Sequence, residues 1–251
     1  MIDKAKFSFW FPAIVAAGVP YPKTEIIKTD LVLLDLLDGK KPKGWDGFLA
    51  EVRGACDKIG YPCFLKTGVF SSKHGWRGTC YIEGPEVLAR HISRIIEDSE
   101  LADMLGLPTD EWIVRELLPT VAPFTSHDGM PVTKERRYFI RPGEVLCHHP
   151  YWPQAAIRTE VPEKLWRPQL DALNEETLEE IEELTRQSLR VSVHLDGVWS
   201  LDWLHATTGW HAIDMAPAAR SFHWEGCPLS AKSILEAHAP KVAKSAGLDP
   251  V

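Results

Sequence analysis

The chain has 251 residues, of which 45% are apolar and 25% are charged, and its net charge is -7. This length fits one large domain or two lobes that share a cleft. The composition predicts a packed core and excludes a disordered chain. No long run of Lys or Arg is present, so nucleic acid is not expected as the main partner.

The five cysteines form no CxxC pair, and the N-terminal residues lack the pattern of a signal peptide. The apolar stretch at residues 7–19 contains Pro12 and is too short to span a bilayer. We therefore expect a cytoplasmic protein with no membrane partner. The run Cys147-His148-His149 offers zinc-binding side chains, but no fourth ligand stands at a usual spacing, which disfavours zinc.

The first half of the chain predicts alternating strands and helices. Residues 1–30 contain three prolines and predict an irregular lead-in with a short strand at 24–27. Apolar residues at helical spacing predict a helix over 48–59 that ends at Gly60. The elements expected after it are a strand at 63–67, a loop at 71–78, a strand at 79–82, a helix that starts at Pro85 and a strand at 112–118.

The second half predicts hairpins around one long helix. A first hairpin pairs residues 136–140 with 144–147, and Asn174 is expected to cap the following helix. Two further hairpins are expected to turn at Asp196-Gly197 and near Thr208-Gly209. This mixed order of elements predicts an α+β fold with antiparallel sheets.

The last hairpin predicts a pair of facing carboxylates. If its loop is Thr207-Thr208-Gly209, Ala206 faces Trp210, and counting outward then places Asp202 opposite Asp214. Two acids so placed repel each other, and a divalent cation such as Mg²⁺ would offset the repulsion. The alternative is a pair of exposed acids on a solvent face, which the strongly apolar flanks disfavour. A register slip by one residue would separate the acids.

Lys66 stands in an apolar strand, where a lysine needs an anionic partner. The loop after it holds small residues and Lys73, and its backbone N–H groups could fold over phosphates. The strand at 112–118 carries Glu116 and Leu118, whose backbone could meet a purine edge. Each segment alone also fits a plain alternative: an edge strand whose lysine reaches solvent, and an ordinary core strand.

Taken in order, these motifs resemble the ATP-grasp superfamily, in which the nucleotide lies between two α+β lobes. The resemblance covers about residues 14–225. The strand at 135–139 followed by residues 146–149 is similar to a subgroup of small ATP-grasp proteins, which occurs in bacteria and phages and in the eukaryotic cell-division-cycle family that assists assembly of a translation initiation factor. The matching segments are residues 62–66, 71–78, 114–118 and 135–139, and Asp202 with Asp214.

The resemblance implies a role for each matching residue. Lys66 would contact the α- and β-phosphates, with Lys73 in the phosphate loop, and Glu116 and Leu118 would meet adenine. Arg137 would contact the γ-phosphate or an acyl-phosphate oxygen and, with Lys66, make up the catalytic pair. The magnesium ligands would be Asp202 and Asp214. The family's usual last ligand, an asparagine, is replaced by Ala216, which leaves His223 and Glu225 as candidates to take its place.

The function implied is that of an ATP-dependent carboxylate–amine ligase with ATP and Mg²⁺ as cofactors. Its partners would be a small-molecule or peptide carboxylate and an amine acceptor, with a basic inner wall for the acidic substrate built from Lys134, Arg136, Arg137 and His149. Two alternatives stay open: a MgATP-dependent assembly protein without turnover, and a phosphotransferase. The lobes expected are a lead-in at residues 1–60, a small lobe at 61–118 and a large lobe at 119–251.

Overall fold

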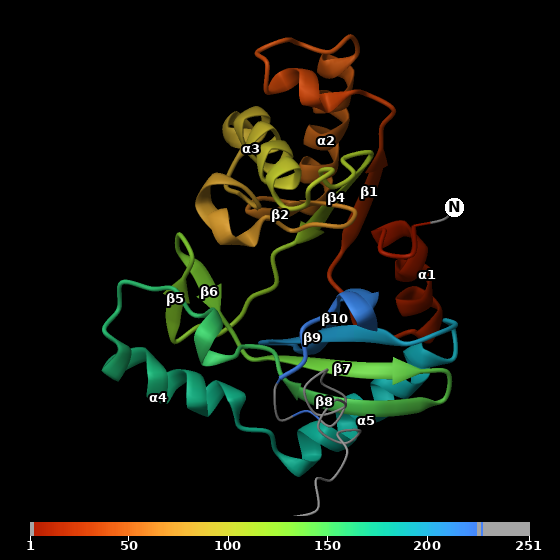
Figure 1. Cartoon of the computed structure of the whole chain (residues 1–251), viewed down its shortest axis with the longest axis vertical. Helices are drawn as coiled ribbons and strands as arrows, with labels where there is room; N and C mark the ends of the chain where they lie inside the picture. Colours follow the sequence, from red (N-terminus) through yellow and green to blue (C-terminus); the bar gives the residue numbers. More distant parts are fainter. Residues whose placement is uncertain (1–2, 225–226, 228–251) are drawn as a thin grey trace, which may run out of the picture.

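A computed structural model describes residues 3–224 and 227 of the chain. It contains two four-stranded antiparallel sheets and a small two-stranded one, with helices on one face of each large sheet. Figure 1 shows the two large sheets one above the other, joined by the segment that precedes β1 and by the segment that follows β4. The predicted α+β class with antiparallel sheets is confirmed.

The upper sheet is built around the strand that contains Lys66. Its order is β1 (Thr24–Lys28), β4 (Glu111–Glu116), β2 (Cys63–Thr67) and β3 (Tyr81–Ile82). Helices α2 (Trp45–Ile59) and α3 (Leu88–Leu101) pack on one face, over Leu65 and Val114. Because side chains alternate along a strand, Lys66 points to the opposite face, where its Nζ reaches Asp214 of the lower sheet.

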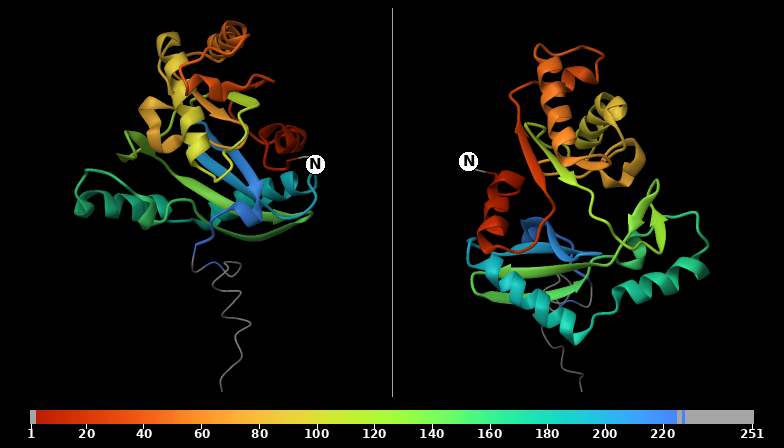
Figure 2. Two further views of the ribbon diagram at one scale, coloured as in Figure 1. Left: turned by 45° about the horizontal axis from the view of Figure 1, so that its top comes forward. Right: turned by 180° about the vertical axis from the view of Figure 1, so that it is seen from behind.

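The lower sheet follows the order β10 (Gly209–Pro217), β9 (Trp199–Ala206), β7 (Glu135–Arg141) and β8 (Glu144–Pro150). Helix α5 (Leu178–Ser192) packs beneath it, on the side away from the upper sheet (Figure 2). Trp199, Leu201 and Trp203 are buried on that side. The residues that alternate with them therefore face the upper sheet. The predicted β7–β8 hairpin is confirmed.

Helix α1 (Phe7–Ala17) occupies the segment for which we predicted an irregular lead-in. Pro12 lies inside this helix, although proline removes one backbone donor. Phe7, Trp10 and Ile14 repeat at helical spacing and are at most 2% exposed, so burial against the lower sheet and α5 outweighs the missing hydrogen bond. The helix ends at Gly18, which has a φ of 60°.

Two predictions for the chain between β8 and β9 were wrong. Asn174 does not cap α5 but is the last residue of an unpredicted helix, α4 (Glu163–Asn174). The N-cap of α5 is Thr177, whose hydroxyl accepts a hydrogen bond from the Glu180 backbone N–H at 3.2 Å. Asp196-Gly197 turns no hairpin, because this segment connects α5 to β9.

The remaining elements are short. The small sheet, β5 (Phe124–Ser126) with β6 (Met130–Val132), was not predicted, and the predicted loop at 71–78 is largely the 3-10 helix η2 (Lys73–Gly78). The other 3-10 helices are η1 (Leu33–Leu36), η3 (Pro85–Val87), η4 (Gln154–Ala156) and η5 (Ala218–Arg220). No helix within the described residues is long and apolar enough to cross a membrane.

The β9–β10 hairpin reaches the predicted carboxylate pairing by a different path. Its turn has two residues rather than three, so Ala206 pairs with Gly209 and not with Trp210. In that register Asp202 would face Ile213. A bulge between Ala212 and Asp214 adds one residue to β10, and Asp202 therefore pairs with Asp214 as predicted.

Candidate functional site

A cleft lies between the facing sides of the two large sheets. The upper side comes from β2, the η2 segment and the chain that follows β4, and the lower side comes from β7, β9 and β10. Its lining includes six of the residues predicted from the sequence to form the site: Lys66, Lys73, Glu116, Leu118, Asp202 and Asp214. Four further residues of the lining were not predicted as site residues: Arg115, Glu135, Tyr151 and Trp152. Arg137 is outside this lining and lies behind Asp202.

Lys66 and Asp214 form an ion pair across the cleft. The Lys66 Nζ lies 3.1 Å from Oδ1 of Asp214. Lys66 is only 4% exposed and lies on an inner strand of the upper sheet, so it is not an edge lysine that reaches solvent. The side chain of Asp214 is 42% exposed. The pair therefore joins the upper sheet to the lower one while part of the Asp214 carboxylate stays open to the cleft.

Asp202 is held by Arg137 from the neighbouring strand. The two residues are directly paired between β9 and β7. The Nε of Arg137 lies 2.7 Å from Oδ1 of Asp202, and its Nη2 lies 2.7 Å from Oδ2. Burial by itself lowers the pKa of Arg137, but the charge of Asp202 and its hydrogen bonds raise it overall. Both oxygens of Asp202 thus accept hydrogen bonds from one guanidinium.

These two ion pairs correct our account of the carboxylate pair. We expected a divalent cation to offset the repulsion between Asp202 and Asp214. Instead, Arg137 neutralises one carboxylate and Lys66 neutralises the other. The alternative of two exposed acids on a solvent face also does not hold, because Asp202 is only 5% exposed.

The donor set nevertheless suits a magnesium ion, which takes oxygen ligands. Asp214 has an open carboxylate oxygen in the cleft, since its Oδ1 accepts the bond from Lys66 and the side chain is partly exposed. Each oxygen of Asp202 already accepts a bond from Arg137, so an ion at Asp202 would share the carboxylate with the guanidinium. Asp214 is therefore the more accessible of the two carboxylates for binding a magnesium ion.

Arg115 on β4 connects the upper sheet to the β10 bulge, and sequence reasoning did not single it out. Its Nη1 donates to the carbonyl of Ile213, the residue that precedes Asp214. Its Nε donates to Oγ1 of Thr24 at 3.3 Å, and the guanidinium lies 5.3 Å from the Phe7 ring centroid. Arg115 is 5% exposed, and this burial lowers its pKa to about 10. No sequence signal distinguishes it from an ordinary strand arginine.

Lys73 is held by an aromatic pair rather than by the loop in which it lies. Its Nζ is 2.9 Å from the Tyr151 hydroxyl and lies over the rings of Tyr151 and Trp152 at 4.4 and 4.6 Å. Burial alone would lower the pKa of Lys73, and neighbouring Tyr151 and Glu135 raise it. This contact ties the η2 segment to the lower half of the cleft.

Glu135 contributes a buried carboxylate to the cleft. It is 6% exposed, and its Oε1 accepts hydrogen bonds from Thr133 Oγ1 at 3.0 Å and Trp152 Nε1 at 3.1 Å. Burial raises its pKa, although Lys73 and the hydrogen bond from Thr133 act in the opposite direction. In the sequence, Glu135 is only the first residue of the matching segment 135–139, and its partners are set by the tertiary structure.

The structure does not form the basic inner wall that we predicted. Arg136 is fully buried on the opposite face of β7, where it pairs with Glu180 and lies 3.7 Å from Glu176. Lys134 pairs with the same Glu180. Burial lowers the pKa of His149, whose Nδ1 lies 2.7 Å from the Pro150 carbonyl. Of the four residues proposed, only Arg137 contacts a side chain that lines the cleft.

Comparison with solved structures identifies this architecture. Two structures of Cdc123 from Schizosaccharomyces pombe match with TM-scores of 0.59 and 0.53, at 15% and 16% identity. Each match covers 93% of this chain and 90% of the other. The chain has the ATP-grasp fold. A RimK domain ATP-grasp protein from Sphaerobacter thermophilus also matches, with a TM-score of 0.48 and 13% identity over 85% of this chain and 60% of that one.

Comparisons of sequence find less than comparisons of structure. No protein-family model matches the chain, and no curated protein is significantly similar to it in sequence. The ATP-grasp fold is therefore recognised through the arrangement of its strands.

Within the ATP-grasp fold, two predicted adenine contacts lie where the upper sheet leads into the lower one. The Glu116 carboxylate accepts a hydrogen bond from the Lys23 backbone N–H at 3.1 Å, and its own N–H donates to the Lys23 carbonyl at 2.9 Å. Leu118 is half-buried and lines the cleft. Glu116 thus already has a bonding partner, and its side chain and backbone hold Lys23 against β4.

Ala216 stands two residues after Asp214 and pairs with Ser200 on β9. The Ser200 hydroxyl lies 3.3 Å from the Ala216 carbonyl and 2.6 Å from the Ser221 hydroxyl. Of the two substitutes considered for the missing asparagine, Glu225 lies outside the described residues. His223 stacks on Phe139 with ring centroids 3.5 Å apart and lies beside two cysteines.

Proposed function

We propose that this ATP-grasp chain binds MgATP in the cleft between its two large sheets. The observation that carries the proposal is the facing pair Asp202 and Asp214. Both line the cleft, and each forms an ion pair with a basic side chain. Alternating charges of this kind suit a ligand that brings both a divalent cation and a polyphosphate, because each protein group can exchange its present partner for one of opposite charge on the ligand.

Each residue receives a role in this proposal. Lys66 turns from Asp214 to the α- and β-phosphates, and Lys73 borders the phosphate loop. The backbone of Glu116 and Leu118 meets the adenine edge. Asp214 and Asp202 hold the magnesium ion, which neutralises phosphate charge when it is bound. Residues 61–118 would then supply one side of the nucleotide site and residues 119–251 the other.

We propose further that the bound ATP activates a carboxylate. A substrate carboxylate oxygen attacks the γ-phosphorus, the bond to the β–γ bridging oxygen breaks, and ADP leaves. An amine then attacks the acyl carbon, phosphate leaves with the bonding pair, and the amine loses a proton. Arg137 stabilises charge on the transferring group after it releases one oxygen of Asp202. The substrates are a small-molecule or peptide carboxylate and an amine acceptor.

Ala216 favours a second candidate, a MgATP-dependent binding or assembly protein without ligase turnover. An alanine side chain has no oxygen for a metal ion, so one ligand of the usual set is missing. Binding of a single magnesium ion through Asp202 and Asp214 would still hold the nucleotide. A partner protein would then be recognised only in the nucleotide-bound state.

Incubation with MgATP and a pool of carboxylates and amines, followed by mass spectrometry, tests the ligase proposal. We expect release of ADP and phosphate together with a condensed product. The Asp214→Asn variant should lose this activity, while Asp46→Asn, which changes an exposed acid on α2, should keep it. A phosphorylated product without condensation would indicate a phosphotransferase, and nucleotide binding without ADP release would favour the assembly protein. No nucleotide binding at all would refute the cleft assignment.

A further inference from the structure

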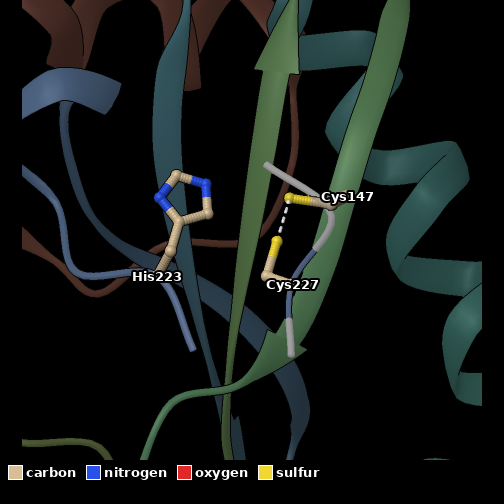
Figure 3. Close-up of side chains that lie close together, drawn as sticks. All are labelled: Cys147, His223 and Cys227. Carbon is tan, nitrogen blue, oxygen red and sulfur yellow. Dashed lines mark hydrogen bonds between the residues drawn. The ribbon is translucent and has the colours of Figure 1, made fainter. Parts of the chain in front are cut away.

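Three side chains that play no part in the nucleotide proposal gather at the lower sheet: Cys147 on β8, His223 and Cys227 (Figure 3). Each offers one donor atom, and these atoms all lie within 4.8 Å of one another. The two sulfur atoms are 3.0 Å apart, and both cysteines are free thiols. We propose that these three residues bind one zinc ion.

The donor set matches the chemistry of zinc. Zn²⁺ binds thiolate sulfur and imidazole nitrogen, most often in a tetrahedral arrangement. Binding here would release one proton from each thiol and leave the imidazole neutral, so two thiolates balance the charge of the ion. A neutral complex suits this place, because Cys227 is only 4% exposed and an unbalanced buried charge is costly. The fourth position is left for water.

His223 supports the assignment by its spacing and by its surroundings. Three residues separate it from Cys227, a spacing that neighbouring ligands in zinc sites commonly have. Among the described residues, its Nε2 is buried without a hydrogen-bond partner. Figure 3 shows a ring nitrogen of His223 on the side of the two sulfur atoms. A metal bond would satisfy a buried nitrogen of this kind.

The site differs from the run Cys147-His148-His149 considered from the sequence. His148 points to the other face of β8, where its Nδ1 lies 2.9 Å from Oε1 of Glu176 and its ring stacks on Tyr138. The partners of Cys147 come instead from the segment after β10. The fold therefore replaces a local cluster by one that only the packing of distant segments creates.

A bound ion would fasten the segment after β10 to the lower sheet, close to Arg137. His223 stacks on Phe139 of β7, and the carbonyl of Phe222 accepts a hydrogen bond from Nη1 of Arg137 at 3.3 Å. The zinc site would thus be a structural site beside the cleft and not a part of the nucleotide site. It does not depend on the proposed MgATP chemistry, and either proposal can fail while the other holds.

Zinc alone is the probe for the test. The full chain is reduced, stripped with a chelator, incubated with zinc chloride and desalted, and its zinc content is measured. We expect one zinc per chain, release of protons on binding and a rise in Tm. Replacement of zinc by Co²⁺ should produce a thiolate-to-cobalt charge-transfer band, which reports sulfur ligands without any substitution.

Matched variants locate the site. Cys147→Ser, Cys227→Ser and His223→Ala should each lose the bound zinc and the Tm increase that zinc causes. Cys63→Ala, a buried thiol in the upper sheet, and His148→Ala, on the other face of β8, should keep both. Zinc binding that survives all three ligand variants would overturn the assignment.

Two further outcomes would also overturn it. The first is a reduced wild-type chain that binds no zinc and shows no cobalt charge-transfer band. The second is a Cys147–Cys227 disulfide that non-reducing mass spectrometry detects, in a chain that still binds no zinc after reduction. The second outcome would make the two cysteines a redox pair instead.

Discussion

Arg137 and Asp202 stand directly opposite each other on β7 and β9 and share two hydrogen bonds of 2.7 Å. The side chains are 13% and 7% exposed, so both charges are largely withdrawn from water. Asp214 has a different environment, because its partner Lys66 reaches it from the other sheet and its side chain is 42% exposed. The two acids thus face each other but differ in how much each contributes to stability.

Asp202→Asn should destabilise the ligand-free protein by about 1.5–3 kcal/mol, because it removes a charge-assisted bond from a mostly buried guanidinium. Asp214→Asn should cost less, about 1 kcal/mol, because the amide oxygen of asparagine can still accept the hydrogen bond from Lys66 and the charge that is lost belongs to a partly exposed acid. Urea denaturation without nucleotide measures both values. Equal costs would show that the difference in exposure does not separate the two acids. A gain in stability for Asp202→Asn would show that repulsion between the acids dominates.

Lys66→Met should weaken MgATP binding by about 10- to 100-fold, the effect of losing one charge-assisted contact. Methionine keeps most of the volume, and the partner left behind, Asp214, is accessible to water, so the fold should persist. Isothermal titration calorimetry measures the affinity. Lys58→Met, which changes an exposed lysine of α2, is the control. An unaltered Kd in the folded Lys66 variant would remove this residue from the nucleotide site.

Neighbouring arginines on β7 should respond differently to truncation. Arg136→Ala should cost about 3–5 kcal/mol of stability, because it leaves the carboxylate of Glu180 buried with one partner fewer. Arg137→Ala should reduce turnover more than it reduces MgATP affinity. Thermal denaturation and steady-state kinetics separate the two effects. A stable, inactive Arg136→Ala beside an active Arg137→Ala would reverse the assignment of faces.

Glu135→Gln should change how stability depends on pH. The raised pKa of Glu135 means that the folded state binds its proton more tightly than the unfolded state does. Its contribution to stability is therefore largest below the ordinary value of 4.5 and falls as pH rises through the raised pKa. The variant can keep the bonds from Thr133 and Trp152 but does not titrate. Urea midpoints across this range should fall less steeply for the variant; parallel curves would contradict the prediction.

Arg115→Met should weaken MgATP binding while the protein stays folded. The substitution removes the donor to the Ile213 carbonyl and so loosens the bulge that brings Asp214 opposite Asp202. Replacing a buried cation by an apolar chain of similar length need not destabilise the fold. Calorimetry measures the affinity, with Arg90→Met on the exposed side of α3 as the control. If both variants bind MgATP as wild type does, Arg115 has no part in positioning the acids.

Local patterns in the sequence predicted the parts of the fold that depend on nearby residues. The strand at 63–67, the β7–β8 hairpin and the helix that ends at Gly60 were all predicted because periodicity and turn residues act over short distances. Helices α1 and α4 were missed, since each contains a proline that argues against a helix locally. Their stability comes from burial against distant segments, which overrides local preference.

The facing of Asp202 and Asp214 was predicted from the sequence, but through the wrong turn. A two-residue turn and a bulge at Ile213 together produce the register that a three-residue turn would have produced. A bulge leaves no clear trace in composition, because it is held in place by contacts such as the one from Arg115. The predicted pairing of the two acids is therefore correct, although the turn from which it was derived is not the one in the structure.

The amino-acid sequence by itself determined the α+β class and the strand that carries Lys66, because these depend on alternation along the chain. The bulge that sets the pairing of the two acids depends on the tertiary structure. The partners of those acids were decided only by the tertiary structure. Lys66 meets Asp214 across two sheets, and Cys147 meets His223 and Cys227 across a long separation in the chain. Such contacts depend on how whole sheets and segments pack, and no local pattern encodes that arrangement.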